Sequence, residues 1–255
     1  MAELELRDLH LAFGGPKVLE SVSLALAANE LLALIGPNGA GKTSVLNCIC
    51  GIYRPTAGEI FFRDERITGA PPHTIARRGI ARTFQHGELL PHLSVLDNLL
   101  IGRHTHVQAG FLSQALFLPP ARAAERSQRE AVERILEFVE LERYRHQPVG
   151  TLGFGTQKIV GFARALALEP KVLLLDEPSA GLNREEREDL ARHILRIKHD
   201  LGIAMVWVEH DMQMVADLAD RLYVLNYGVP LAAGAPEAVL KDPRVIAAYL
   251  GGATA

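Results

Sequence analysis

Cysteine is scarce in this chain of 255 residues, which holds only Cys48 and Cys50. Two cysteines are too few for a disulfide scaffold, and they lack the second pair of ligands that a structural zinc site needs. We therefore expect both thiols to be packing residues in a reducing compartment.

Long apolar runs and an excess of charge of one sign are also missing. No apolar stretch approaches the roughly 18 residues that span a membrane, and the first ten residues alternate polar and apolar side chains, unlike a secretory signal. The formal net charge is only −3, from 27 basic and 30 acidic residues, so bulk charge gives no reason to bind nucleic acid or an anionic bilayer. If this protein works at a membrane, we expect another chain to hold it there.

The rest of the composition is that of a globular protein. Hydrophobic residues make up 48% of the chain and charged residues 22%, which excludes disorder and fibrous repeats. Runs that are apolar or alternating predict strands at 4–13, 21–36, 171–178 and 203–211, and helical runs stand at 42–51 and 184–202. With a predicted hairpin in 55–68, the pattern favours an α/β fold in which a parallel sheet has an antiparallel β edge.

The middle of the chain, about 94–147, changes to helical character. Val132, Ile135, Leu136 and Val139 follow the spacing of one helix face, with charged residues between them. This predicts a helical subdomain inserted into the α/β unit, so that residues 1–93 and 148–255 form the core of a single domain.

A glycine-rich loop follows the buried strand that ends at Gly36. The stretch GPNGAGKT matches G-x-x-x-x-G-K-[ST], with a strand before it and a helix after it. Such a loop lets backbone N–H groups converge on phosphate oxygens at a helix N-terminus. We expect Lys42 to neutralise the β- and γ-phosphates of ATP and Thr43 to offer its hydroxyl to Mg²⁺. The expected nucleotide-binding residues of the loop are Gly36, Pro37, Asn38, Gly39, Ala40, Gly41, Lys42, Thr43 and Ser44.

Two carboxylates close the apolar strand VLLLDEP. Adjacent strand residues point to opposite faces, so Asp176 and Glu177 are expected to differ in role. Asp176 suits magnesium coordination, and Glu177 suits polarising the attacking water.

Three more motifs stand in a specific order around these two. They are RTFQH with Gln85, SAGLN from Ser179 to Asn183, and VEHDM with His210. The joint order resembles the ATP-binding cassette (ABC) transporter ATPases over nearly the whole chain, which implies a P-loop ATPase core. The resemblance implies that Gln85 and the switch histidine His210 act with Glu177 in catalysis. It also implies that Gln85 is a further magnesium ligand. It also implies that Phe13 stacks on adenine and that SAGLN is the D-loop, although Asn183 stands where many members have aspartate.

Taken singly, each of these residues has a simpler interpretation. Gln85 could be a loop amide, His210 a strand-end histidine and Phe13 a core aromatic. His104 and His106 have no motif around them, and we expect them to be surface or loop residues rather than metal ligands.

The signature motif of that family departs from its usual form here. A leucine and a serine usually begin it, and this chain has Leu152, Gly153, Phe154, Gly155 and Thr156, which the resemblance places against the ATP of a partner subunit. Gly153 removes a hydroxyl contact to a charged group, worth ~1.5–3 kcal/mol. Glycine is still an acceptable N-cap, and the helix N–H groups still point at an anion. We therefore expect a weakened but working signature in a helix from about 152.

Looser signatures resemble the branched-chain amino-acid uptake ATPases. They include RTFQHGELLPHLSVLDNLLIGRH and the ending GVPLAAGAPEAVLKDPRVIAAYLG. This resemblance implies an ATP-hydrolysing importer subunit that pairs with a second ATPase, the same chain or a different one, beneath two membrane permease subunits. A periplasmic solute-binding protein would deliver the substrate, and the ATPase would sit at the cytoplasmic face of the inner membrane, peripherally and without nucleic acid.

Other readings stay open at this point. A related system for urea uptake or lipid export, a soluble ABC ATPase without a membrane partner, and a non-hydrolysing regulatory subunit each fit part of the pattern, although Glu177 argues against the last. The apolar stretch 109–120 either meets the membrane subunit or lies buried beneath the helices.

Overall fold

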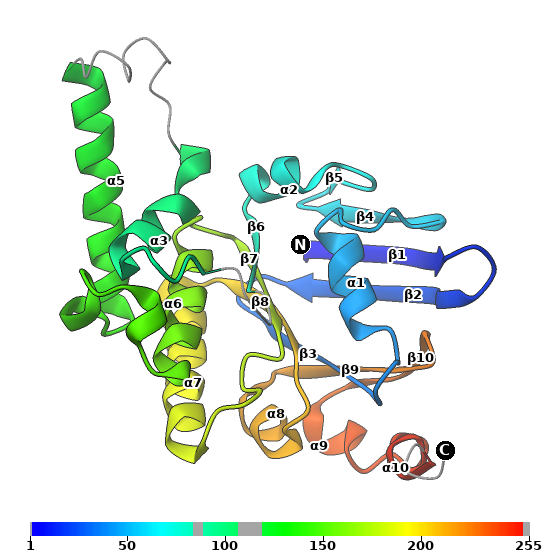
Figure 1. Cartoon of the computed structure of the whole chain (residues 1–255). Coiled ribbons are helices and arrows are strands. Elements are labelled where there is room, and N and C mark those ends of the chain that lie inside the picture. The colour runs from blue at the N-terminus through cyan, green and yellow to red at the C-terminus, as the bar shows by residue number, and fades with distance from the viewer. Residues whose placement is uncertain (1, 84–88, 107–118, 252–255) are drawn as a thin grey trace. The chain divides into compact units, whose positions relative to one another are not determined.

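The computed structural model describes residues 2–83, 89–106 and 119–251, and within these the chain divides into two compact units (Figure 1). One unit is formed by residues 1–85 together with 171–255, and the other by residues 86–170. We describe each unit by itself.

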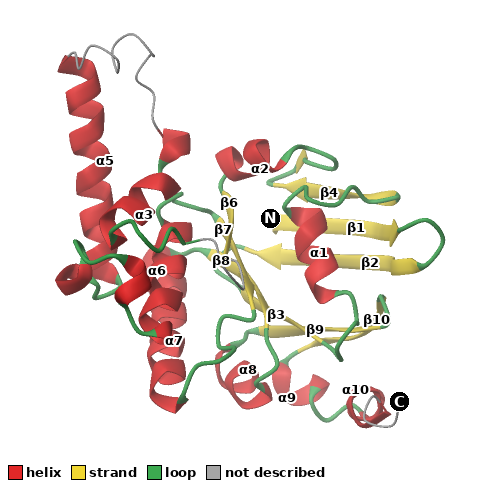
Figure 2. Cartoon of the chain, viewed as in Figure 1, coloured by secondary structure: helices red, strands yellow, loops and turns green. Residues whose placement is uncertain are grey.

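The first unit holds an antiparallel sheet near the N-terminus (Figure 2). Its four strands lie in the order β2-β1-β4-β5, with bounds β1 Ala2–Ala12, β2 Lys17–Ala27, β4 Ala57–Phe62 and β5 Glu65–Arg66. The predicted hairpin is confirmed, because Arg63 and Asp64 between β4 and β5 both take the positive φ of a tight two-residue turn. Along β2 the alternation of polar and apolar residues buries Leu19, Val22 and Leu24.

A second, six-stranded sheet has the order β10-β9-β3-β8-β7-β6. Its strands are β3 Leu31–Ile35, β6 Ile80–Thr83, β7 Val172–Asp176, β8 Ala204–Val208, β9 Arg221–Asn226 and β10 Val229–Gly234. All neighbours are parallel except β9 and β10, so the predicted parallel sheet with an antiparallel β edge is confirmed. Every residue of β3, β7 and β8 is buried, which explains why these segments read as unbroken apolar runs.

Helices of this unit connect and cover the sheets. They are α1 Lys42–Ile49, α2 Pro72–Arg78, α7 Arg184–Arg196 with a π-helical end Ile197–Leu201, α8 Met212–Leu218, α9 Pro236–Val239 and α10 Pro243–Gly251. One hydrophobic core contains residues of both sheets and of α1, so α1 packs into the same core as the two sheets.

Both cysteines belong to this first unit. They are free thiols, Cys48 buried and Cys50 half-buried, which confirms their packing role. Burial raises the pKa of Cys48 to about 12 and that of Cys50 to about 11.

The second unit is helical. Its helices are α3 Val95–Gly102, α5 Pro119–Phe138 and α6 Phe154–Leu166, joined by short 3-10 turns at His104–His106, Glu142–Tyr144 and Val149–Thr151. Of the predicted apolar face, Val132 and Leu136 of α5 are buried, Ile135 is half-buried, and Val139 is buried just after the helix ends. Because α6 packs on α3 and α5, the compact unit spans residues 86–170 and is longer than the expected subdomain of about 94–147. The expected bounds of the core and of the helical subdomain stay a prediction.

The two histidines of the helical unit at positions 104 and 106 bond to the backbone. The rings of His104 and His106 each hydrogen-bond a backbone carbonyl oxygen, of Ile101 and Leu168 respectively, both at 3.0 Å.

The expectation about membrane spans agrees with the described residues, among which no helix is long and apolar enough to cross a membrane. The apolar stretch 109–120 lies almost wholly outside the described residues, so both of its interpretations stay open.

The buried parallel strands should dominate the stability of the first unit. We expect Leu174→Ala, at the fully buried centre of β7, to lower the free energy of unfolding by about 2–5 kcal/mol, because it removes apolar contacts and leaves a cavity. Urea unfolding followed by circular dichroism measures this. The matched control is Leu201→Ala, at a side chain that is 48% exposed, which should change stability by no more than about 0.5 kcal/mol. A loss of the same size in both variants would contradict the assignment of this core.

Candidate functional site

The glycine-rich loop joins the buried end of β3 to the first turn of α1. A side chain on Gly36 would come within 2.1 Å of the carbonyl oxygen of Leu225, and Gly36 has φ +150°. Gly41, the N-cap of α1, has φ +95° and packs against Leu19. Glycine is therefore needed at both ends of the loop, where the backbone turns in a left-handed conformation close to other strands.

Lys42 lies inside this loop and is only 6% exposed. Its Nζ donates hydrogen bonds to the carbonyl oxygens of Gly36 at 2.8 Å and Pro37 at 3.0 Å. Desolvation by burial lowers the pKa of Lys42, while the nearby charges of Glu177 and Asp176 oppose that shift. The ammonium is thus held within the loop by neutral carbonyl oxygens, which bind a cation less strongly than anionic phosphate oxygens do.

The two carboxylates that close β7 have different surroundings, as their adjacent positions predict. Asp176 is 3% exposed and forms an ion pair with Arg82, Oδ2 to Nη2, at 2.6 Å. Glu177 has φ +47°, a left-handed conformation that costs a non-glycine residue about 1 kcal/mol or more and that concentrates at functional sites. Its backbone N–H donates to the carbonyl oxygen of Val208 at 2.9 Å, which ties this turn to the end of β8.

Glu177 and His210 meet across the ends of β7 and β8. The distance between Glu177 Oε1 and His210 Nε2 is 2.8 Å, and both side chains keep partial access to solvent, 22% and 38% exposed. A carboxylate and an imidazole at hydrogen-bonding distance can share a proton and orient a water molecule. Sequence reasoning placed both residues in catalysis but did not predict this contact.

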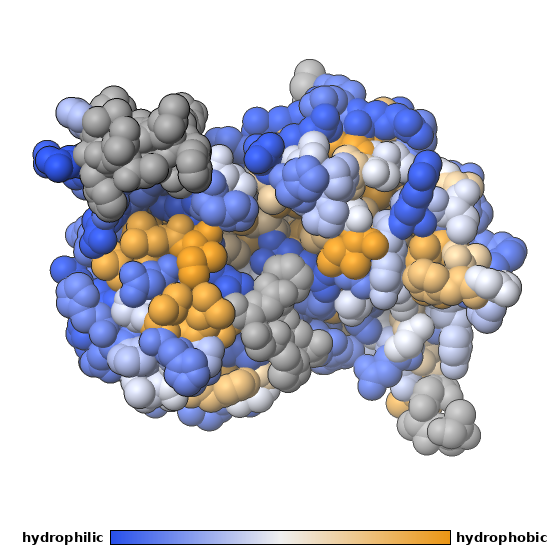
Figure 3. Space-filling model, turned by 45° about the horizontal axis from the view of Figure 1, so that its top comes forward, coloured by the Kyte–Doolittle hydropathy of each residue, from blue (hydrophilic) through white to orange (hydrophobic). Residues whose placement is uncertain are grey.

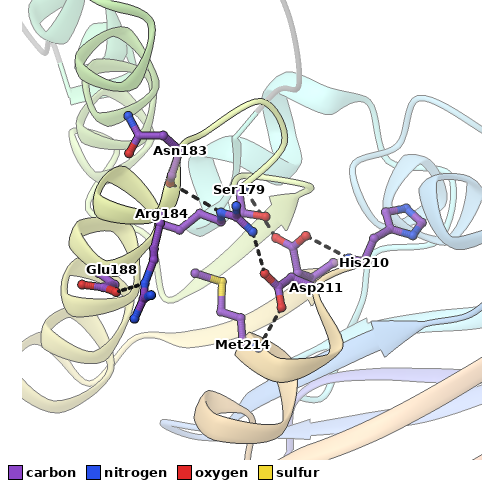
Figure 4. A network of polar contacts seen from close by, with 9 residues as sticks. Ser179, Asn183, Arg184, Glu188, His210, Asp211 and Met214 are labelled. Atoms are coloured by element: carbon purple, nitrogen blue, oxygen red, sulfur yellow. Dashed lines mark hydrogen bonds and ion pairs between the residues drawn. The ribbon is translucent and has the colours of Figure 1, made fainter.

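A buried carboxylate beside this pair was missed by sequence reasoning. Glu209 is 2% exposed, and its two oxygens accept hydrogen bonds from the backbone N–H groups of His210 at 2.8 Å and Ser179 at 3.4 Å (Figure 4). It therefore joins the loop after β8 to the loop after β7. The signal was present, because an acid directly after the apolar run of a buried strand repeats the arrangement of Asp176.

The same network continues into α7 and α8. Asp211 caps α8 by accepting from the N–H of Met214 at 3.1 Å, and Arg187 on α7 forms an ion pair with Asp211 at 3.0 Å (Figure 4). The Met214 N–H and Arg187 lower the pKa of Asp211.

Asn183 begins α7 in a capping box with Glu186. Because asparagine and aspartate cap helices about equally well, the substitution at Asn183 keeps the helix start.

Phe13 lies outside the hydrophobic core. Its side chain is 51% exposed and meets Tyr53 edge to face, with ring centroids 5.0 Å apart. The ring is therefore not a core aromatic, and its expected stacking on adenine stays a prediction.

The residues expected to form the signature lie at the start of α6 in the helical unit. Gly153 is the N-cap with φ −60°, a conformation open to any residue, and no side-chain cap is formed. Leu152 is buried, whereas Phe154 is 52% exposed. Gly155 is buried and Thr156 is half-buried in the first turn. A partner that meets this helix end would therefore find backbone N–H groups and an aromatic ring.

The residues expected to hold magnesium fit a hard cation. Asp176 Oδ1 is buried and has no hydrogen-bond partner among the described residues, and Thr43 is exposed at the start of α1. Oxygen donors of this kind suit Mg²⁺, which also keeps water and phosphate oxygens in its shell. Gln85, the third expected ligand, lies outside the described residues. Within the described ranges no group of three or more His, Cys, Asp or Glu side chains forms a closed metal site.

Comparisons with known families agree over most of the chain. The profile of the family described as "ABC transporter" matches residues 19–180. A second profile, described as "Branched-chain amino acid ATP-binding cassette transporter", matches residues 229–255.

Curated relatives and a solved structure extend the similarity to almost the full length. The high-affinity branched-chain amino acid transport ATP-binding protein BraF of Pseudomonas aeruginosa is 40% identical over 248 residues, 97% of each chain. The corresponding LivG protein of Escherichia coli is 41% identical over 251 residues, again 97% of each chain. The crystal structure of the ADP conformation of MJ1267, an ATP-binding cassette of an ABC transporter, superimposes with a TM-score of 0.87 at 32% identity, covering 98% of this chain and 99% of that one.

The buried ammonium of Lys42 gives a prediction about folding and ligand binding together. We expect Lys42→Met to leave the free energy of unfolding of the nucleotide-free protein within about 1 kcal/mol of the wild type, because relief of desolvation offsets two lost hydrogen bonds. The same variant should lose the stabilisation by ATP, about 2.7 kcal/mol at a hundredfold excess over Kd. Urea unfolding with and without ATP measures both.

The matched control is the exposed Lys241→Met, which should keep the stabilisation by ATP. Full retention of that stabilisation in Lys42→Met would refute a role for this ammonium in phosphate binding.

Proposed function

The chain belongs to the ABC transporter ATP-binding proteins, which hydrolyse ATP to power transport, and from that premise we propose that it drives the uptake of branched-chain amino acids. The observation that supports this cargo is the similarity to BraF and LivG over 97% of the chain, together with the match of residues 229–255 to the branched-chain profile. A sulfate and thiosulfate import protein, CysA of Pseudomonas syringae, is also 34% identical over 94% of the chain, so the cassette alone does not define the cargo.

We propose that the nucleotide binds along the loop from Gly36 to Ser44, with its adenine on Phe13. The exposed ring of Phe13 and the inward-facing ammonium of Lys42 support this placement. Bound magnesium would supply charge neutralisation at the β- and γ-phosphates. Thr43, Asp176 and Gln85 are the residues that we assign to hold it.

Hydrolysis in this proposal depends on Glu177 and His210. Glu177 orients the attacking water, and its strained backbone and short contact to the imidazole support a position fixed for that purpose. His210 and Lys42 stabilise the charge that develops on the phosphate. Glu209 accepts from the backbone N–H of His210 and so helps to hold the switch loop in place.

We propose that ATP is shared between two subunits, with the signature residues from Leu152 to Thr156 of one facing the phosphate loop of the other. The free N–H groups at the start of α6 support anion binding without the usual serine hydroxyl. Dimer closure would then pass to the membrane partner through Gln85 and the subdomain of about 94–147.

The proposed partners are two membrane permease subunits, which receive substrate from a periplasmic solute-binding protein. Within the helical unit, Leu90, Leu93, Ile101 and Phe154 are exposed apolar side chains, and Figure 3 shows apolar atoms gathered on this unit, at the left of the view. Such a surface supports association with another protein. We place the chain peripherally, at the cytoplasmic face of the inner membrane.

The function is tested by ATP turnover of the chain assembled with its own membrane partners in lipid. A binding protein loaded with leucine, isoleucine or valine should raise turnover, and Glu177→Gln should lower it by about 100-fold or more while ATP still binds. Glu188→Gln, which removes an exposed carboxylate paired with Arg184, is the matched control and should keep full turnover. Turnover that ignores every amino acid tested would leave the ATPase but refute the cargo. A chain that assembles with no membrane protein would favour a soluble ABC ATPase.

A second prediction concerns the missing serine of the signature. A side chain added at Gly153 meets no atom within 4 Å, so Gly153→Ser is expected to fold normally and to regain a hydroxyl contact to the partner's ATP. A hydrogen bond to a charged group is worth about 1.5–3 kcal/mol, so ATP affinity of the assembled dimer should rise by about tenfold or more. Gly161→Ser is the matched control, since the same helix also leaves open space at that position. Equal affinity in Gly153→Ser and wild type would count against the weakened signature.

A further inference from the structure

Arg82, the first residue of RTFQH, is the centre of a buried network, and neither the family resemblance nor the proposed mechanism gives Arg82 itself a role. It lies on β6, opposite Leu174 of β7 and three residues before Gln85. Its guanidinium donates to Asp176 Oδ2 through Nη2 and to Asn47 Oδ1 through Nη1, both at 2.6 Å. The side chains of Arg82 and Asp176 are only 7% and 3% exposed.

These contacts join three elements that build the nucleotide site. Asn47 belongs to α1, the helix that begins with Lys42, and its backbone oxygen accepts from the N–H groups of Ile52 and Tyr53. Asp176 ends β7, and Arg82 lies on β6. A single planar fork of donors therefore fixes the carboxylate of β7 to the phosphate-loop helix.

The two oxygens of Asp176 are left in different states. Oδ2 is bonded to the guanidinium, whereas Oδ1 is buried without a hydrogen-bond partner in the part of the chain that the structure describes. A buried acceptor without a partner is costly, and such atoms are rare unless an ion, water or ligand completes them. The contact with Arg82 thus selects which oxygen stays available to an incoming cation.

We propose that Arg82 is a positioning residue for magnesium: it holds Asp176 Oδ2 against Asn47 and so leaves Oδ1 fixed for the shell of the cation. This inference rests on the proposed role of Asp176 in holding magnesium. Lysine cannot replace Arg82 fully, because one ammonium on a flexible stem cannot bridge the carboxylate and the amide in the same plane.

The test compares ATP affinity with magnesium and with a chelator in the full-length chain, using the fluorescence of trinitrophenyl-ATP. In Arg82→Gln the gain in affinity that magnesium supplies should fall by about tenfold or more, while metal-free affinity stays within about twofold of the wild type. Asn47→Leu keeps the ion pair but removes the second anchor, so a smaller loss of the magnesium gain, about threefold, is expected. Arg82→Lys should lie between Arg82→Gln and the wild type.

The controls separate positioning from a general loss of structure. Arg63→Gln removes an exposed arginine paired with Glu3 and should leave both affinities unchanged. Equal weakening with and without magnesium in the Arg82 variants, an unchanged magnesium gain, or a larger one would overturn the inference. If Arg82→Gln does not fold, Asn47→Leu and Arg82→Lys decide by the same criterion.

Asp176→Asn distinguishes this inference from the function on which it rests. A normal magnesium gain in Asp176→Asn would refute the proposed magnesium role of Asp176 itself. A lost gain in Asp176→Asn beside a normal gain in the Arg82 variants would refute only the inference about Arg82.

Discussion

The parallel alignment of β3, β7 and β8 is the constraint on which the rest of the nucleotide site depends. In the sheet order β8 lies between β3 and β7, so the carboxyl ends of all three strands meet at one edge. The phosphate loop leaves β3, Glu177 follows β7, and His210 follows β8. The ammonium of Lys42 therefore lies near a carboxylate and an imidazole that come more than a hundred residues later in the chain, and any slip of register would move them apart.

Lys42, Asp176 and Glu209 place charged groups in buried positions near that edge, and each charge has its own partner. The ammonium of Lys42 is held by loop carbonyl oxygens, Asp176 is paired with a guanidinium, and Glu209 accepts from two backbone N–H groups. A buried charge without such a partner would cost several kcal/mol. The two hydrogen bonds of Glu209 also fix the loop after β7 to the loop after β8.

Two departures from the family pattern, Gly153 and Asn183, both stand at the first residue before a helix. Gly153 begins α6 without a side-chain cap, because the helix N-terminus presents its own N–H groups. Asn183 caps α7 as aspartate would, with Glu186 completing the box. Both substitutions therefore keep the local start of a helix, whereas Gly153 also removes the hydroxyl of the usual serine. By contrast, Lys42 and Glu177, to which we assign roles that depend on their own charge, match the pattern.

The sequence by itself determined the α/β class, the glycine-rich loop, the paired acids after an apolar strand and the apolar face of α5, because each follows from local spacing. Even the hairpin of β4 and β5 was readable from its turn. Only the tertiary structure decided that Glu177 contacts His210, that Phe13 is exposed and that α6 packs with α3 and α5. It also decided the partners of Arg82 and Glu209. These contacts join residues from separate elements, and the partner that a charged side chain finds depends on strand order and register, which no short stretch of sequence encodes.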